Sequence, residues 1–249
     1  MPNMKAKLAD PAYRFSGSIC TIPSAVVTQA YAAAGADFVI VDLEHGAVDY
    51  GSAHAMIAAT QGFDCAPLVR IAQTSEAEVK RALDIGAEGI VFPLIRSAED
   101  AKRAVASLRY PPEGTRGFGP FLAHSRWGVP LPRYKDEVAP EMVCCLLIET
   151  REGVENIDEI LAVDGIDLIV PAQFDLSTDL GISGQFDHPE FRAAVEKVET
   201  AAKAAGVPLL QACLSAEQAA DLFARGYRGI CGFDVLSLKG AAATMASWT

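Results

Sequence analysis

Short apolar runs alternate with amphipathic helical patterns along the whole chain. Eight runs are expected as strands, near residues 17–22, 37–42, 66–71, 88–93, 143–149, 167–171, 207–212 and 229–233. Eight helical patterns lie between and after them, near 24–34, 51–61, 75–85, 97–108, 153–162, 188–205, 215–225 and 235–246. Several of the runs are almost continuously apolar, which is typical of strands buried on both faces. Helices between such strands predict parallel crossovers.

Strict alternation of eight strands and eight helices within 249 residues predicts an α/β fold, and a (β/α)₈ barrel is its simplest form. An open doubly wound sheet is the alternative. The first strand–helix junction carries no G-x-G-x-x-G motif, which weakens a dinucleotide-binding interpretation. No linker or repeat marks a second domain, so residues 1–249 are expected to form a single barrel.

One segment, at about residues 109–141, departs from this rhythm and is rich in proline and glycine. A connection of that length is usually functional, interfacial or disordered. We expect one of two roles for this segment. It either shapes a substrate pocket, within its own subunit or across a subunit boundary, or wraps the base of the barrel.

Composition narrows the class of protein. The chain is 51% hydrophobic and 21% charged, with a formal charge of −11, so it is globular and a poor ligand for nucleic acids or anionic membranes. The longest charge-free stretch, 15–36, is interrupted by polar residues and predicts neither a membrane span nor a signal peptide. Six cysteines without a C-x-x-C motif are expected as reduced core thiols, which favours a cytoplasmic setting.

Ionisable residues stand where several predicted strands end, which is where barrel enzymes place their chemistry. They are Asp42, Glu44 and His45 after the second strand, Arg70 after the third, Glu149 after the fifth and Asp175 after the sixth. No lysine ends a predicted strand, so a Schiff-base mechanism is disfavoured.

Glu149 and Asp175 follow adjacent strands, so their carboxylates can converge. Two carboxylates with open positions suit a hard cation such as Mg²⁺ or Mn²⁺. The alternative is that each carboxylate only caps the following helix.

His45 has carboxylates beside it in sequence, which suits general acid–base work near neutral pH. Arg70 ends an apolar strand, where an unpaired charge is costly. Its partner is either a structural carboxylate such as Asp42 or a developing oxyanion.

The motifs together resemble a known family. They are the segments 42–46 (DLEHG), the strand ending in Arg70, 83–87 (LDIGA), 110–117 (YPPEGTRG), 148–150 (IET) with 154–158 (VENID), and 174–177 (FDLS). In this order they resemble the HpcH/HpaI family of class II pyruvate-dependent aldolases, similar to 4-hydroxy-2-oxoheptanedioate aldolase, over about residues 15–240. The resemblance is specific for the family and less so for the substrate.

The resemblance implies a barrel of the phosphoenolpyruvate/pyruvate type with its last helix exchanged between subunits, in hexamers or trimers. It implies a divalent cation (Mg²⁺, Mn²⁺ or Co²⁺) on Glu149 and Asp175. Arg70 then matches the residue that holds the keto oxygen and the enolate, and His45 matches the acid–base residue acting with Asp42. The implied reaction is reversible cleavage of a 4-hydroxy-2-oxo acid to pyruvate, or a related 2-oxo acid, and an aldehyde.

The resemblance also implies further site residues. Asp84 matches a carboxylate lent by a neighbouring subunit. Backbone N–H groups of Ala172, Gln173 and Phe174 are expected near the substrate carboxylate, although many relatives have Gly-Pro just before the Asp-Leu-Ser motif. Leu214, which follows the seventh predicted strand, is expected from that position to face the aldehyde.

Two other functions remain open. One is an acyl-CoA lyase of the citramalyl- or malyl-CoA type, although no basic patch for a large phosphorylated cofactor is evident. The other is a phosphate-binding barrel of a different class, with residues 229–232 (GICG) as the phosphate loop.

Overall fold

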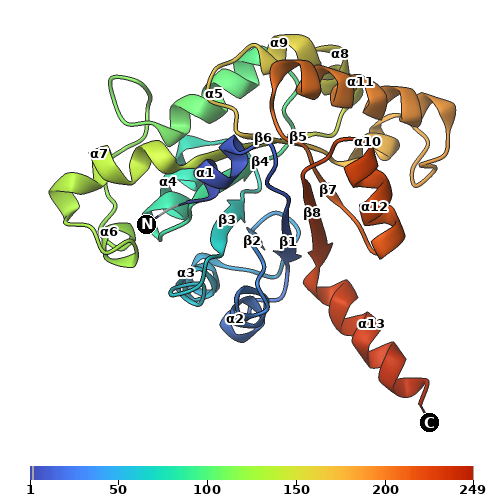
Figure 1. Ribbon diagram of the computed structural model, residues 1–249. Helices are drawn as coiled ribbons and strands as arrows, with labels where there is room; N and C mark the ends of the chain where they lie inside the picture. Colours follow the sequence, from blue (N-terminus) through green and yellow to red (C-terminus); the bar gives the residue numbers. More distant parts are fainter. Residues whose placement is uncertain (2, 249) are drawn as a thin grey trace.

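The predicted strands form one parallel sheet that curls into a nearly closed barrel (Figure 1). The computed structural model describes residue 1 and residues 3–248. The strands are β1 (Phe15–Cys20), β2 (Phe38–Asp42), β3 (Ala66–Arg70), β4 (Gly89–Phe92), β5 (Val143–Ile148), β6 (Leu168–Pro171), β7 (Leu210–Ala212) and β8 (Gly229–Phe233). Their order in the sheet is β6-β5-β4-β3-β2-β1-β8-β7, so the (β/α)₈ prediction is confirmed.

The barrel closes weakly between β6 and β7. A single bridge joins Ile169 to Leu209 there. Gln211 adds a side-chain link by donating from Nε2 to the carbonyl of Pro171 at 2.9 Å. A glutamine therefore replaces part of the backbone ladder at this seam.

The outer helices follow the predicted rhythm. They are α2 (Ala25–Ala33), α3 (Tyr50–Ala58), α4 (Glu76–Asp84), α5 (Ala98–Leu108), α8 (Arg151–Glu155), α9 (Ile157–Leu161), α11 (Pro189–Ala205), α12 (Ala216–Ala224) and α13 (Asp234–Ala246). The helix expected over 153–162 is two short helices that meet at Asn156. A further short helix, α10 (Gln173–Asp179), was not expected from the sequence.

The barrel interior is a packed core closed at its base by α1 (Met4–Ala9). Met4 and Leu8 pack against inward-facing strand residues such as Phe15 and Leu68. The buried carboxylate of Glu88 accepts the backbone N–H groups of Asn3 and Met4 at 2.8 and 2.7 Å, which fastens α1 there. Because α1 blocks the N-terminal ends of the strands, substrates can reach the barrel only from the C-terminal ends of the strands.

The 109–141 segment is ordered and lies at the base. It leaves the last turn of α5 and enters the first residue of β5, both of which are at the N-terminal end of the barrel. It contains α6 (Ala123–Arg126), α7 (Tyr134–Glu137) and two 3₁₀ turns, η1 (Leu131–Arg133) and η2 (Ala139–Glu141). It therefore wraps the base and can shape a substrate pocket only across a subunit boundary.

The last helix, α13, extends away from the barrel (Figure 1). After the buried Asp234, every described side chain of α13 is exposed, including those of Leu238 and Met245. Among the described residues, no helix is long and apolar enough to cross a membrane. All six cysteines are free thiols, and five of them are buried, as expected for core positions.

Candidate active site

The site is built around an ion pair between neighbouring strand ends. Asp42 and Arg70 are paired in register across β2 and β3. Arg70 donates from Nε to one oxygen of Asp42 at 2.9 Å and from Nη2 to the other at 2.6 Å. The Asp42 side chain is fully buried, so the two-pronged contact satisfies a charge that could not otherwise stay there. Asp42 is thus the structural partner of Arg70 that the sequence analysis offered as one of two options.

His45 stands at the rim with a different partner from the one expected. Its imidazole Nε2 lies 3.7 Å from Oε2 of Glu44, and its side chain is 63% exposed. Asp42 instead accepts the backbone N–H groups of Glu44 and His45 at 3.0 and 3.2 Å. Asp42 therefore shapes the loop that carries His45, while Glu44 is the carboxylate beside the ring.

Glu44 is a site residue to which the sequence analysis gave no role of its own. Its Oε2 lies 3.4 Å from Nε of Arg70 and is buried without a hydrogen-bond partner. Burial raises the pKa of Glu44, and the charges of Asp42 and Asp175 raise it further. A signal was available, because Glu44 stands between Asp42 and His45 just after a predicted strand, where barrel enzymes place their chemistry.

Glu149 is the most deeply perturbed carboxylate of the site, with a pKa well above its usual value. It is the first residue after β5, is 4% exposed, and accepts the backbone N–H of Leu94. Burial raises its pKa to about 7, and the charges of Asp175 and Glu44 contribute to the rise. Three carboxylates from the ends of β2, β5 and β6 therefore act on one another within one site.

Asp175 reaches the site from the first turn of α10. The alternative interpretation, that it only caps a helix, does not describe its position. The residue at the cap is Ala172, and no side chain makes a capping hydrogen bond there.

The chemistry of these groups fits a divalent cation. The charges of Glu44, Glu149 and Asp175 influence one another, and Arg70, whose charge acts on Glu44 and Glu149, is already paired with Asp42. Burial, and after it the charges of Asp175 and Glu44, disfavour the ionised form of Glu149, and a bound hard cation would favour that form. Within the described part of the chain, no group of three or more His, Cys, Asp or Glu side chains could hold a metal by itself. Glu149 and Asp175 remain the predicted pair.

The predicted substrate contacts divide into two groups. Gln173, Phe174 and Leu214 line one cavity of about 700 Å³ at the strand ends, between α10 and α12. Ala172 has no free N–H to offer, because its N–H donates to the carbonyl of Ile148 at 3.0 Å. The expectation for the backbone of Ala172 is therefore wrong, whereas Gln173 and Phe174 begin α10 and lie beside the cavity.

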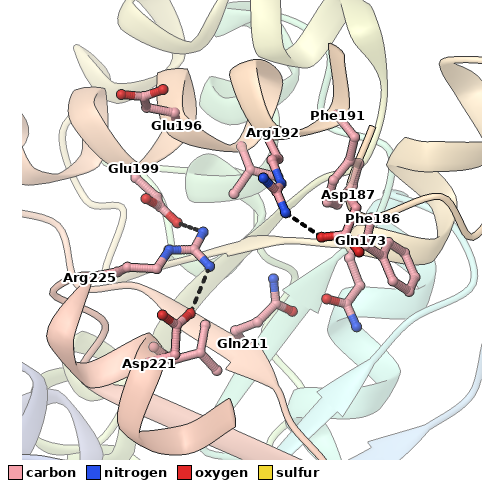
Figure 2. A pocket seen from close by; sticks show the side chains of 12 residues that line it. Gln173, Phe186, Asp187, Phe191, Arg192, Glu196, Glu199, Gln211, Asp221 and Arg225 are labelled. Atoms are coloured by element: carbon pink, nitrogen blue, oxygen red, sulfur yellow. Dashed lines mark hydrogen bonds and ion pairs between the residues drawn. The ribbon is translucent and has the colours of Figure 1, made fainter. Parts of the chain in front are cut away.

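A second cavity of about 590 Å³ continues from this one between α11 and α12 (Figure 2). Arg225 and Arg192 enter it, but each is already paired. Arg225 contacts Glu199 and Asp221, and Arg192 contacts Asp187. Both cavities share Gln173 and Gln211, so they form one groove that leads away from the strand ends.

Asp84 lies far from the other predicted residues within the chain. It ends α4, at the base of the barrel, whereas Glu149 follows the opposite end of β5. Nη2 of the buried Arg116 donates to its Oδ1 at 2.9 Å. Phe118 and Phe121, close in sequence to Arg116, are exposed. Asp84 can act in catalysis only if a second subunit receives it.

Known proteins of one family match most of this chain. The family model for HpcH/HpaI aldolase/citrate lyase matches residues 21–239. A hydroxypyruvate/pyruvate aldolase of Roseovarius nubinhibens is 33% identical over 232 residues, covering 89% of this chain and 87% of the relative. A 4-hydroxy-2-oxo-heptane-1,7-dioate aldolase of Salmonella heidelberg is 38% identical over 176 residues, covering 70% of this chain and 66% of the relative.

Solved structures give the same answer. The crystal structure of an HpcH/HpaI aldolase from Desulfitobacterium hafniense superimposes with a TM-score of 0.90 at 33% identity, covering 98% of this chain and 95% of the other. The match spans the barrel and its strand ends, where the acidic residues, Arg70 and His45 lie. The resemblance found in the sequence is confirmed, and the chain belongs to the HpcH/HpaI aldolase/citrate lyase family.

Proposed function

We propose that the protein is a metal-dependent pyruvate aldolase, a carbon–carbon lyase that reversibly cleaves a 4-hydroxy-2-oxo acid to pyruvate and an aldehyde. The observation that carries the proposal is that Glu44 lies 3.4 Å from Arg70 and 3.7 Å from His45, while the charges of Glu44, Glu149 and Asp175 act on one another. The names of the two relatives support the same reaction class.

Charge determines the proposed mechanism. Cleavage leaves an enolate, and a divalent cation held by Glu149 and Asp175 would supply Lewis-acid stabilisation of its negative charge. Arg70 keeps N–H groups that Asp42 does not use, and these hold the keto oxygen as charge develops on it. His45, exposed at the rim, removes the proton of the C4 hydroxyl in cleavage and returns it in synthesis.

The first residues of α10, Gln173 and Phe174, are proposed to hold the substrate carboxylate with their backbone N–H groups. The first N–H groups of a helix have no partner within it, so they can donate hydrogen bonds to an anion. Both residues line the larger cavity and directly precede Asp175 in α10, which supports this assignment.

A homo-oligomer completes the proposed enzyme. An isolated helix of the length of α13 is marginally stable in water, and its exposed leucines and methionine need a partner surface. We assign that surface to a second copy of the chain. The same assembly would allow Asp84 to reach a neighbouring site, framed by the exposed Phe118 and Phe121.

The aldehyde is proposed to be uncharged. The larger cavity contains Asp187, Glu217 and Asp221 against a single cation, Arg225, which is already paired. Phe174 and Leu214 supply the apolar wall. An aldehyde ending in a carboxylate would meet net negative charge there, whereas a neutral one would not.

The reaction itself is tested by incubating metal-stripped protein with pyruvate and a panel of aldehydes, with Mg²⁺, Mn²⁺ and Co²⁺ added in turn. We expect carbon–carbon bond formation only with a metal. Aldol activity that survives chelation would overturn the proposal. Malyl-CoA and citramalyl-CoA belong in the same panel, because the family includes citrate lyase.

A further inference from the structure

Leu94 has an unusual backbone conformation. Within residues 1 and 3–248, it is the only residue other than glycine with a positive φ, at 54°. L-amino acids with a side chain avoid this left-handed region, so surrounding contacts must hold the residue there. The leucine side chain does not supply them, because it is 45% exposed.

The left-handed turn aims one backbone group at the site. Leu94 follows β4, which pairs with β5 up to Phe92 and Leu146, so its loop lies beside the end of β5. The N–H of Leu94 donates to Oε1 of Glu149. A hydrogen bond to a carboxylate is stronger than one between neutral groups, and this one restricts how a buried carboxylate can turn.

Residues 95 and 96, which follow Leu94, are held by contacts with α8 and with Asn156. A Cβ on Gly153 would lie 2.6 Å from the carbonyl oxygen of Ile95, so α8 approaches the loop closely. Nδ2 of Asn156 donates to the carbonyl of Arg96 at 2.9 Å. The Ile95 side chain is buried in the core. These contacts hold residues 95 and 96 in place, and Leu94 must take the left-handed turn to connect them to β4.

We propose that Leu94 is a positioning residue, whose strained backbone presents its N–H to Glu149 and fixes that carboxylate for cation binding. The inference rests on the proposed function, in which Glu149 holds a divalent cation. The role belongs to the backbone, because the side chain at position 94 faces solvent. A residue that tolerates the left-handed region should therefore replace Leu94 without loss of cation binding. A residue without an N–H should weaken cation binding.

The test compares Leu94→Gly with Leu94→Pro in the full chain. Glycine adopts positive φ freely, whereas proline has φ near −65° and no N–H. The dissociation constant for Mn²⁺ is measured by calorimetry on metal-stripped protein, with the thermal midpoint as the measure of folding. We expect Leu94→Gly to bind Mn²⁺ within about twofold of wild type and Leu94→Pro to bind about tenfold more weakly or worse.

A second variant perturbs the loop without touching position 94. Gly153→Ala places a methyl group against the Ile95 carbonyl and should also weaken Mn²⁺ binding, so the test remains decisive if Leu94→Pro does not fold. A merely structural role would lower the thermal midpoint and leave Mn²⁺ affinity unchanged in the folded protein.

The outcomes separate the two claims. If wild type binds Mn²⁺ and a folded Leu94→Pro or Gly153→Ala binds it equally well, the role of Leu94 is overturned and the proposed function stands. If Leu94→Gly loses Mn²⁺ affinity, the role of the backbone is likewise overturned. If wild type binds no Mn²⁺, Mg²⁺ or Co²⁺, the metal assignment fails, and the inference fails with it.

Discussion

The imidazole of His45 lies beside the carboxylate of Glu44, with 3.7 Å between Nε2 and Oε2. Glu44 also lies 3.4 Å from Nε of Arg70, so one carboxylate faces both the proposed base and the proposed oxyanion holder. Asp42, which the resemblance paired with His45, is instead occupied by Arg70 and by backbone N–H groups. Glu44 therefore lies beside the proposed base, whereas Asp42 holds Arg70 and the loop that carries His45. The first prediction concerns His45 itself.

His45→Ala should lower kcat about 10²- to 10⁴-fold, the usual contribution of a positioned acid–base group, with a much smaller change in KM for pyruvate. The side chain is exposed, so the thermal midpoint should not move. His54→Ala is the matched control, because His54 is exposed on α3 and remote from the strand ends. Equal kcat values for wild type and His45→Ala would reject His45 as the base.

Arg70→Lys should impair catalysis and folding together. Lysine cannot reproduce the planar, two-pronged contact with Asp42, which would leave part of a buried charge unsatisfied. We expect a loss of roughly 2 kcal/mol in unfolding free energy and a fall in kcat/KM of at least about 100-fold. Chemical denaturation and steady-state kinetics measure the two effects. A variant that loses stability but keeps kcat/KM in its folded fraction would confine Arg70 to a structural role.

The high pKa of Glu149 makes a prediction about stability. The pKa of Glu149 rises from 4.5 in the unfolded chain to about 7 in the folded protein. The folded protein therefore binds this proton more tightly than the unfolded chain does. Stability contributed by the protonated form is therefore present below pH 4.5 and is lost as the pH rises through about 7.

Glu149→Gln should therefore stabilise the metal-free protein at pH 8, by up to about 3 kcal/mol, and should make little difference near pH 4.5. Urea titrations at the two pH values measure this. A wild-type protein that is as stable as the glutamine variant at pH 8 without metal would show that the carboxylate is not strained by burial.

The proposed preference for uncharged aldehydes can be tested within the cavity. Wild type should use a neutral aldehyde such as glycolaldehyde or butanal with a higher kcat/KM than succinic semialdehyde. Glu217→Gln should narrow that gap by a factor of a few at low salt, because it removes one exposed charge from the wall. Glu152→Gln, on the exposed side of α8, is the control and should leave the ratio unchanged. A wild-type preference for the anionic aldehyde would contradict the proposal.

The barrel could be predicted from sequence because its strands are short apolar runs bounded by glycine and by serine caps. Ser97, for example, begins α5 with a reciprocal cap, in which its side chain accepts the N–H of Asp100 and the Asp100 carboxylate accepts the N–H of Ser97. The base plug α1 could not be predicted, because six residues carry too few turns for a periodic pattern and its order depends on Glu88, far along the chain. The break at Asn156 was missed for a similar reason, since it depends on a tertiary hydrogen bond to Arg96.

The site could be predicted in part, because its ionisable residues follow the C-terminal ends of predicted strands. Register across β2 and β3 could not be read from either strand alone, so the pairing of Asp42 with Arg70 was only one of two options. The positive φ at Leu94 has no sequence signal, because leucine is not a residue that favours it. Backbone strain of this kind becomes visible only once the surrounding contacts are in place.

The exposed face of α13 gives the last prediction, on assembly. If a second copy of the chain covers α13, a charge placed among its apolar residues should weaken association. Leu238→Asp should shift the protein toward a smaller oligomer in size-exclusion chromatography with light scattering, and should lower activity if Asp84 acts across subunits. Ala204→Asp adds the same charge to an exposed position of α11 and should leave the mass unchanged. A wild-type protein that is fully active as a monomer would contradict both the assembly and the catalytic use of Asp84.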